Sequence, residues 1–146
     1  MKIRKFRKED AKGCSEIIKK SMRKNMQKEL RKRILNETKP ENLIKDKKKQ
    51  YFVCEENGKI LGIGALNKKE NEVKTMYIHP KFQGKGIGTE ILKVVEKEAK
   101  KRGIKKLILY THNPAFKFYL KNKYNIIEIF TKDSGGKIYY MEKRLR

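Results

Sequence analysis

The fold of this chain is indicated most strongly by one stretch, His79-Pro80-Lys81-Phe82-Gln83-Gly84-Lys85-Gly86-Ile87-Gly88. Its three glycines follow an apolar segment that ends at Ile78, and an amphipathic segment begins directly after them. Glycines permit a tight turn and a close approach of the backbone to an anion, while the first N–H groups of a helix point toward that anion. The stretch therefore predicts a strand, a phosphate-binding turn and a helix.

Two common phosphate-binding loops do not fit this stretch. The GxxxxGK[ST] pattern of the P-loop is absent from the sequence. The preceding strand is expected to be the last of an antiparallel meander, Gln50–Glu55, Ile60–Leu66 and Glu72–Ile78, with a hairpin turn at Asn57-Gly58. A dinucleotide fingerprint instead follows the first strand of a βαβ unit, so that interpretation is excluded.

The remaining elements follow from hydrophobic period and turn residues. Helices are expected over 11–21 with Asp10 as cap, from Asn25 to Leu35, after a break at Pro40, over Ile87–Arg102 with Gly103 as stop, and from Asn113-Pro114 to Lys121; further strands are expected at Lys2–Phe6, Leu107–Tyr110 (buried), Ile126–Thr131 and Lys137–Glu142. We expect one domain over residues 1–146. Its class is α/β (α+β), a mixed, mostly antiparallel sheet with helices on both faces and the order β-α-α-β-β-β-α-β-α-β-β.

The charge of the chain indicates an anionic partner. It has 40 Lys and Arg against 17 Asp and Glu, a formal net charge of +23. A solvated basic surface is the simplest explanation, and a polyphosphate ligand or nucleic acid are the alternatives. Lysine dominates and no arginine-rich reading helix stands out, which disfavours a nucleic-acid-binding or ribosome-binding module without excluding it.

Cysteine usage and hydropathy limit the class of protein further. Cys14 and Cys54 are far apart and have no CxxC partner, so we expect buried thiols and no metal site. No apolar run approaches the 18 or so residues that a membrane span needs. The N-terminus has no apolar signal segment, and we therefore expect a cytoplasmic protein.

At this point the sequence resembles a known family, the GCN5-related N-acetyltransferases. The family signature Q/R-x-x-G-x-G/A follows a strand and opens a helix, and residues 83–88 match it at every fixed position. The lead-in Met76 to Phe82 matches the family's apolar-x-apolar-x-Pro-x-aromatic pattern. Downstream, Asn113-Pro114-Ala115-Phe116-Lys117-Phe118-Tyr119 resembles the family's Asn…Ala-x-x-Phe-Tyr segment.

This resemblance implies where acetyl-CoA binds. The sheet of the family splays open between its fourth and fifth strands, here Glu72–Ile78 and Leu107–Thr111. The pantetheine arm lies in that gap and bonds to strand backbone, while the glycine turn holds the pyrophosphate. The residues implied to bind acetyl-CoA are Met76, Tyr77, Ile78, Gln83, Gly84, Lys85, Gly86, Ile87, Gly88, Thr89 and Asn113; core packing is the alternative role for the side chains of Met76 and Ile78.

The resemblance also implies two catalytic side chains, Tyr119 and Glu72. Tyr119 would donate a hydrogen bond to the departing thiolate, and its alternative role is that of an amphipathic core tyrosine. Glu72 stands where the histone-acetylating members carry their base, and its alternative is a solvated carboxylate at a strand end. The Glu that serves the N-terminal-peptide-acetylating members is replaced here by Ile108. A backbone N–H near Met76 to Ile78 is the candidate oxyanion donor.

The function expected on this resemblance is transfer of an acetyl group to a primary amine by direct attack on the thioester. The acceptor, a protein, a peptide or a small molecule, is not identified by the sequence. A regulator that binds acyl-CoA without catalysis remains the alternative within the same fold.

Overall fold

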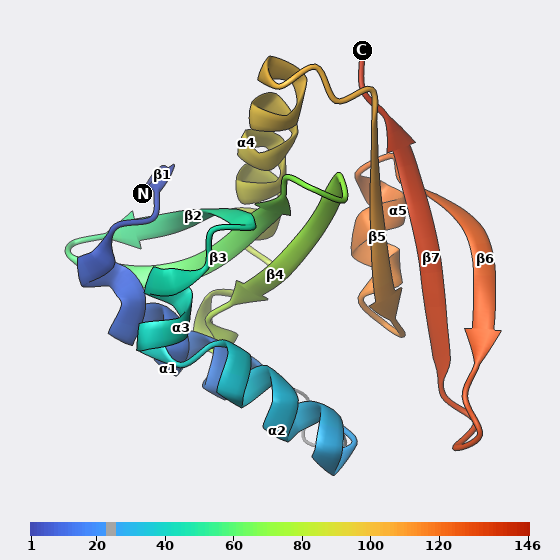
Figure 1. Ribbon diagram of the computed structural model, residues 1–146, viewed down its shortest axis with the longest axis horizontal. Coiled ribbons are helices and arrows are strands. Elements are labelled where there is room, and N and C mark those ends of the chain that lie inside the picture. Colours follow the sequence, from blue (N-terminus) through green and yellow to red (C-terminus); the bar gives the residue numbers. More distant parts are fainter. Residues whose placement is uncertain (23–25) are drawn as a thin grey trace.

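The computed structural model describes residues 1–22 and 26–146, and within them seven strands form one sheet (Figure 1). The strands are β1 Lys2–Lys5, β2 Lys49–Glu56, β3 Lys59–Asn67, β4 Glu72–Ile78, β5 Lys106–His112, β6 Asn125–Thr131 and β7 Lys137–Arg144. The α-helices are α1 Ala11–Ser21, α2 Lys28–Glu37, α3 Pro40–Lys45, α4 Ile87–Lys101 and α5 Phe116–Lys121, with short 3₁₀ turns at Lys8–Asp10 and Pro80–Phe82. This is the mixed α+β architecture that the sequence predicts.

The strands lie in the order β1-β2-β3-β4-β5-β7-β6. Every neighbouring pair is antiparallel except β4 and β5, which are parallel. The long crossover from β4 to β5 contains α4, as a parallel connection requires. The last strand, β7, inserts between β5 and β6, so β6 forms an edge of the sheet.

The expected splay lies between β4 and β5. Glu72 and Ile108 are the one pair of Cα partners recorded between these strands in the described residues. The Ile108 N–H donates to Asn71 O at 3.0 Å, at the start of β4. Beyond this point the two strands diverge toward their C-terminal ends, and Figure 1 shows β4 turning away from β5.

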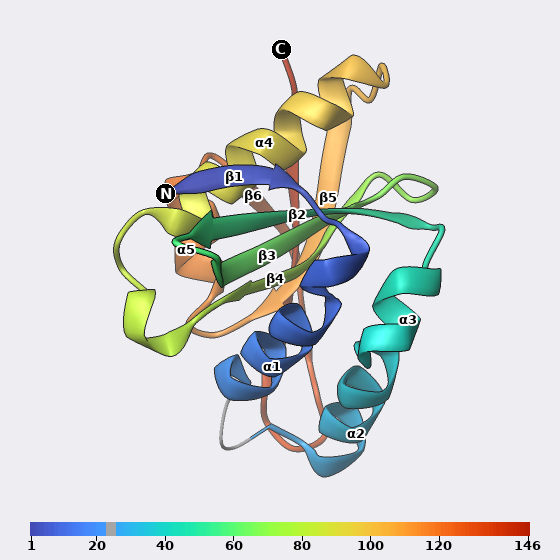
Figure 2. The ribbon, with the colours of Figure 1, turned by 90° about the vertical axis from the view of Figure 1, so that its left-hand side faces the viewer.

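The helices cover the two faces of the sheet unequally. Figure 2 shows α4 on one side of β1–β4 and the three helices α1, α2 and α3 on the other. Ile91, Leu92 and Val95 of α4 are buried in the larger core, which extends to Tyr119 of α5. A second core forms between Ile18 of α1 and the opposite face of β2 and β3.

Two glycines of β3 let α4 approach the sheet closely. A Cβ atom on Gly64 would lie 2.5 Å from Cγ2 of Ile91 and 3.1 Å from Cε of Met76. A Cβ atom on Gly62 would lie 2.9 Å from Cδ1 of Ile78. The missing side chains therefore let side chains of α4, the helix that follows the glycine turn, and of β4 pack directly against β3.

Several local predictions are confirmed. The Asn57-Gly58 turn has positive φ at both residues, as a two-residue hairpin requires. Gly103 follows the C-cap of α4 with φ +79°. The thiols of Cys14 and Cys54 are free and buried.

Other local predictions are wrong. Asp10 is the N-cap residue of α1, but its side chain makes no capping hydrogen bond to that helix; it accepts from the Arg7 N–H at 2.7 Å and closes the 3₁₀ turn before α1. Helix α5 begins at Phe116 rather than at Asn113-Pro114. Strand β5 is not buried throughout, because Tyr110 is 54% exposed.

The N-terminal helices also differ from expectation in extent. The expected start of the second helix at Asn25 lies outside the described residues, and α2 itself runs from Lys28 to Glu37. The restart expected at Pro40 forms a short helix of its own, α3, which the predicted element order does not count. In the described part of the chain, every helix is too short or too polar to cross a bilayer.

Candidate functional site

The glycine turn adopts the geometry that its composition predicts. Gly84 has φ +76° and Gly86 has φ +87°, a region that other residues rarely adopt. A Cβ atom at either position would meet nothing within 4 Å, so the backbone here faces open space. Gly86 is the N-cap of α4, and its carbonyl accepts the first bond of the helix, from the Glu90 N–H at 3.1 Å.

The first turn of α4 presents backbone donors beside this open space. An α-helix leaves the N–H groups of its first turn without intrahelical acceptors, and its dipole favours an anion there. The Lys85 ammonium lies 5.4 Å from the Phe82 ring centroid, at the same turn. Ile87 is buried beneath the turn. Gly88 brings α4 against α5, because a Cβ atom there would lie 3.1 Å from Cζ of Phe118.

Strand β4 is bulged where it approaches the turn. Its pairing with β3 shifts between Ile63 and Ala65, so β4 contains one extra residue. Thr75 occupies the bulge with φ +55°, which is unusual for a β-branched residue. After the bulge, Met76 packs toward α4 and Tyr77 toward α1 and α2.

The end of β4 is fixed by three hydrogen bonds. The Ile78 carbonyl accepts from Ser21 Oγ of α1 at 2.8 Å and from Gln83 Nε2 at 3.2 Å. The His79 N–H donates to Leu61 O at 2.8 Å. Gln83 therefore folds back on the strand, and Ser21, which no sequence signal indicates, ties α1 to the glycine turn.

Tyr119 lies inside the molecule, on the α4 side of the sheet. Its ring makes edge contacts with Phe118 and Tyr124, at centroid distances of 5.0 and 5.8 Å. Burial, and then the nearby Tyr77, raise the pKa of the Tyr119 hydroxyl. The hydroxyl is therefore protonated at neutral pH and can act only as a neutral donor or acceptor.

Glu72 is buried rather than solvated. It is 6% exposed, and none of the described residues forms a salt bridge or hydrogen bond with its carboxylate. Burial raises its pKa, an effect opposed by Lys74 and Lys49 and reinforced by Glu70. A carboxylate with a raised pKa is better matched to proton transfer near neutral pH than an ordinary one.

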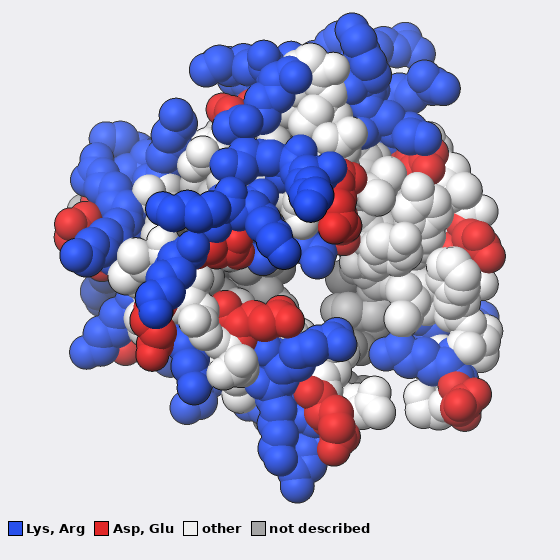
Figure 3. Space-filling view, in the orientation of Figure 1, with Lys and Arg blue, Asp and Glu red and all other residues white. Residues whose placement is uncertain are grey.

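Glu72 opens onto a cavity of about 420 Å³ between α2 and the diverging strands. Tyr77 and Thr75 of β4 line it from one side and Tyr110 of β5 from the other. Figure 3 shows an opening through the molecule in this region. The glycine turn and Tyr119 belong to the α4 side of the sheet, so the gap between β4 and β5 joins them to this cavity.

Asn113 and Thr89, two further predicted cofactor-binding residues, lie at α5 and α4. Asn113 is exposed, in the turn before α5, and its carbonyl lies 3.1 Å from Nδ1 of His112. Thr89 Oγ1 lies 3.4 Å from Asn122 Nδ2. Within residues 1–22 and 26–146, no three His, Cys, Asp or Glu side chains group as metal ligands would.

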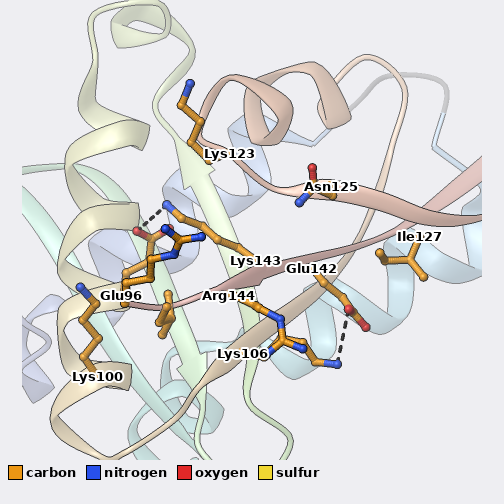
Figure 4. Close-up of a pocket in the computed structure, with 11 residues that line it drawn as sticks. Glu96, Lys100, Lys106, Lys123, Asn125, Ile127, Glu142, Lys143 and Arg144 are labelled. Carbon is orange, nitrogen blue, oxygen red and sulfur yellow. Dashed lines mark hydrogen bonds and ion pairs between the residues drawn. The ribbon is translucent and has the colours of Figure 1, made fainter.

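A second cavity, of about 630 Å³, lies at the far end of α4 (Figure 4). Its two carboxylates are both paired, Glu96 with Lys143 at 3.0 Å and Glu142 with Lys106 at 3.4 Å. Glu96 also accepts from the Tyr124 hydroxyl at 2.8 Å. This cavity contains none of the predicted site residues, and the paired charges support the packing behind Tyr119.

The family assignment follows from comparison with known proteins. The family model described as "Acetyltransferase (GNAT) domain" matches residues 6–145, nearly the whole chain. The chain belongs to this family. Over 70 residues the GNAT domain is 37% identical to an uncharacterised N-acetyltransferase of Methanocaldococcus jannaschii, covering 42% of this chain and 31% of that protein.

A second relative is a spermidine N(1)-acetyltransferase of Thermoplasma acidophilum. It is 34% identical over 76 residues, which cover 50% of this chain and 44% of the relative. The aligned parts thus span less than half the length of both curated relatives.

Solved structures share the fold over almost its full length. The PaiA N-acetyltransferase of Thermoplasma acidophilum, crystallised with coenzyme A, has a TM-score of 0.79 at 23% identity and covers 98% of both chains. The Escherichia coli ribosomal-protein-S18-alanine N-acetyltransferase has a TM-score of 0.75 at 17% identity, covering 99% of this chain and 93% of its own. At these identities the likeness establishes the fold.

Proposed function

We propose that this GNAT domain is an acetyl-CoA-dependent N-acetyltransferase that transfers the acetyl group to a primary amine by direct attack on the thioester. The observation that carries the proposal is the glycine turn at the N-terminus of α4, with positive φ at Gly84 and Gly86, beside strands that part at Glu72. That arrangement offers backbone donors to a pyrophosphate and strand backbone to an extended arm.

The glycine turn and strand β4 would bind different parts of acetyl-CoA. Backbone from Gly84 to Thr89 would hold the pyrophosphate, with Lys85 adding charge. Backbone of β4 from Met76 to Ile78 would bond to the pantetheine arm, on the side that β5 leaves open. The coenzyme A complex of the Thermoplasma acidophilum PaiA enzyme supports this use of the shared fold.

In the proposed reaction Glu72 accepts the proton that the acceptor amine must lose. Neutralising a lysine amine at pH 7 costs about 4.6 kcal/mol, and an α-amine only about 1.4 kcal/mol. A buried carboxylate with a raised pKa and no cation bound to it is suited to this task. The amine nitrogen then forms its bond to the thioester carbon.

Departure of the thiol completes the reaction. A β4 backbone N–H between Met76 and Ile78 stabilises the intermediate oxyanion. As the C–S bond breaks and the amide forms, the nitrogen releases its second proton to solvent. Burial raises the pKa of Tyr119. Its hydroxyl is therefore too weak an acid to give up its proton, and it serves as a hydrogen-bond donor to the leaving thiolate, which takes its final proton from solvent.

Binding of acetyl-CoA is tested with one variant and a matched control. Acetyl-CoA should raise the melting temperature of the wild-type protein, and Gly86→Glu should abolish that rise. Gly103→Glu introduces the same charge at a glycine with similar φ, +79°, at the opposite end of α4. The control should retain the full shift. A normal shift in Gly86→Glu contradicts the loop assignment.

Catalysis is tested by thiol release. Acetyl-CoA mixed with a panel of primary amines should yield free coenzyme A with at least one acceptor. A protein that shows the thermal shift but releases no thiol with any amine is the non-catalytic acyl-CoA-binding regulator instead.

A further inference from the structure

The cavity beside Glu72 contains more positive than negative side chains. It receives charged groups from α2, β2, β4 and the β6–β7 turn: Arg33, Glu37, Lys49, Glu72, Lys74 and Lys132. This is the cavity from which the acceptor amine of the proposed reaction approaches Glu72. Its charges therefore bear directly on which amines can bind.

Ion pairing leaves most of these cations uncompensated. Lys49 is bound to Asp46 at 2.8 Å, outside the lining. Among the ion pairs of the described residues, with N–O distances up to 4.0 Å, none involves Arg33, Lys74 or Lys132. These three residues come from separate elements around one cavity, so an anion bound there would be attracted to all of them.

The negative side chains do not balance them. Glu72 is assigned to accept the proton of the amine, and once it has done so it carries no charge. Glu37 is then the remaining acidic residue in the described lining, against the three cations Arg33, Lys74 and Lys132, in a chain whose net charge is +23. A polyamine that has lost one proton still carries further ammonium groups, and these would be repelled by the cations that line the cavity.

We infer that the acceptor is a primary amine that also carries a carboxylate or phosphate group, and that Arg33, Lys74 and Lys132 receive this group. The inference rests on the proposed acetyltransferase function and specifies its substrate class. It separates this domain from its spermidine-acetylating relative in Thermoplasma acidophilum. The cavity volume, about 420 Å³, is that of a small-molecule site.

The same cations assist the chemistry. Positive charge near an amine disfavours its ammonium form, so the bound amine loses its proton more readily than in water. An anionic group on the acceptor is attracted to these cations and offsets the repulsion of its ammonium group. The same cations lower the pKa of that ammonium group. An amino acid or an amino phosphate combines both features in one small molecule.

The test compares acceptors of similar size in which the anionic group is present, absent or replaced by a second amine. Thiol release from acetyl-CoA is measured with phosphoethanolamine against ethanolamine, with 4-aminobutyrate against putrescine, and with spermidine. Acidic and basic tripeptides with the same N-terminal residue distinguish a peptide source from a free small molecule. We expect kcat/KM to favour the anionic member of each pair about 10-fold or more, a difference of roughly 1.4 kcal/mol.

Variants tie that preference to the cavity. The double variant Arg33→Gln/Lys74→Gln should bring the ratio within each pair close to one while leaving the thermal shift by acetyl-CoA intact. Lys12→Gln/Lys97→Gln removes two exposed charges elsewhere and should keep the ratio. Preference for spermidine or putrescine overturns the inference and leaves the acetyltransferase function standing. Absence of thiol release with every amine overturns both.

Discussion

Glu72 and Ile108 face each other at the point where β4 and β5 part. The pairing closes the sheet on one side of them and leaves it open on the other. Glu72 is thereby held where the gap begins, buried but lining the cavity of about 420 Å³. Glu72, which the sequence predicts to be the base, thus lies where the two halves of the sheet meet.

Glu72→Gln should stabilise the protein at neutral pH. Because the folded-state pKa of Glu72 is raised above its ordinary 4.5, wild-type stability declines as the pH rises through 4.5 toward the folded value. The neutral amide removes that penalty, so the gain should be full at pH 8 and vanish below about pH 4.5. Urea midpoints at pH 4 and pH 8 measure it. An equal change at both values would mean that the ionisation of Glu72 is not the cause.

The same variant should lower kcat with an amine acceptor by about 10²-fold or more, as loss of a general base does. Glu70→Gln is its matched control, an exposed carboxylate two residues earlier on the β3–β4 turn. Because Glu70 is exposed and its charge is screened by solvent, the control should retain kcat within about 3-fold of the wild type. A comparable loss in both variants would point to general electrostatics rather than to a base.

Tyr119→Phe should reduce kcat about 10²-fold without altering the thermal shift by acetyl-CoA, because it removes a donor used at the leaving thiolate and keeps the ring. Tyr124→Phe is the contrasting change. It removes the hydroxyl that donates to Glu96 at 2.8 Å, and should cost about 1.5–3 kcal/mol of stability with little effect on kcat. Unchanged turnover in Tyr119→Phe would reduce Tyr119 to a core residue.

Gly64→Ala should destabilise the protein by about 1–3 kcal/mol, since its Cβ would lie 2.5 Å from Cγ2 of Ile91. Gly13→Ala in α1 is the matched comparison. Its Cβ would lie 3.3 Å from Cγ1 of Ile60, the helix gains from losing a glycine, and we expect a gain of about 0.5 kcal/mol. Thermal unfolding of the two variants distinguishes close helix packing from a general intolerance of added methyl groups.

Asp10→Asn should lower stability by about 1.5–3 kcal/mol at pH 7. Arg4 donates to both carboxylate oxygens of Asp10, at 2.8 and 2.9 Å, and holds its pKa below the ordinary 3.8. That contribution is present above pH 3.8 and is lost as the pH falls toward the lowered folded value. The difference between variant and wild type should therefore shrink below pH 3.8. A constant difference would assign the loss to packing.

Local signals in the sequence predicted the parts of the site that depend on backbone conformation. Gly84 and Gly86 adopt the positive φ that their turn requires, and the order of strands around them identifies the sheet. The bulge at Thr75 had no such signal, because a β-branched residue at positive φ is imposed by the pairing of β4 with β3. Ser21 was missed for a similar reason. Its partner, Ile78 O, is 57 residues away in the chain.

The sequence by itself determined the family and the glycine turn, and it predicted the tyrosine and glutamate that we propose for catalysis, because each depends on residue type and short spacing. Only the tertiary structure decided that Glu72 is buried without a bound cation and that Arg33, Lys74 and Lys132 surround one cavity with it. Those properties depend on where α2, β4 and the β6–β7 turn meet in space. The pKa of a side chain is set by every charged or burying group near it in the fold, and not by its neighbours in the chain alone.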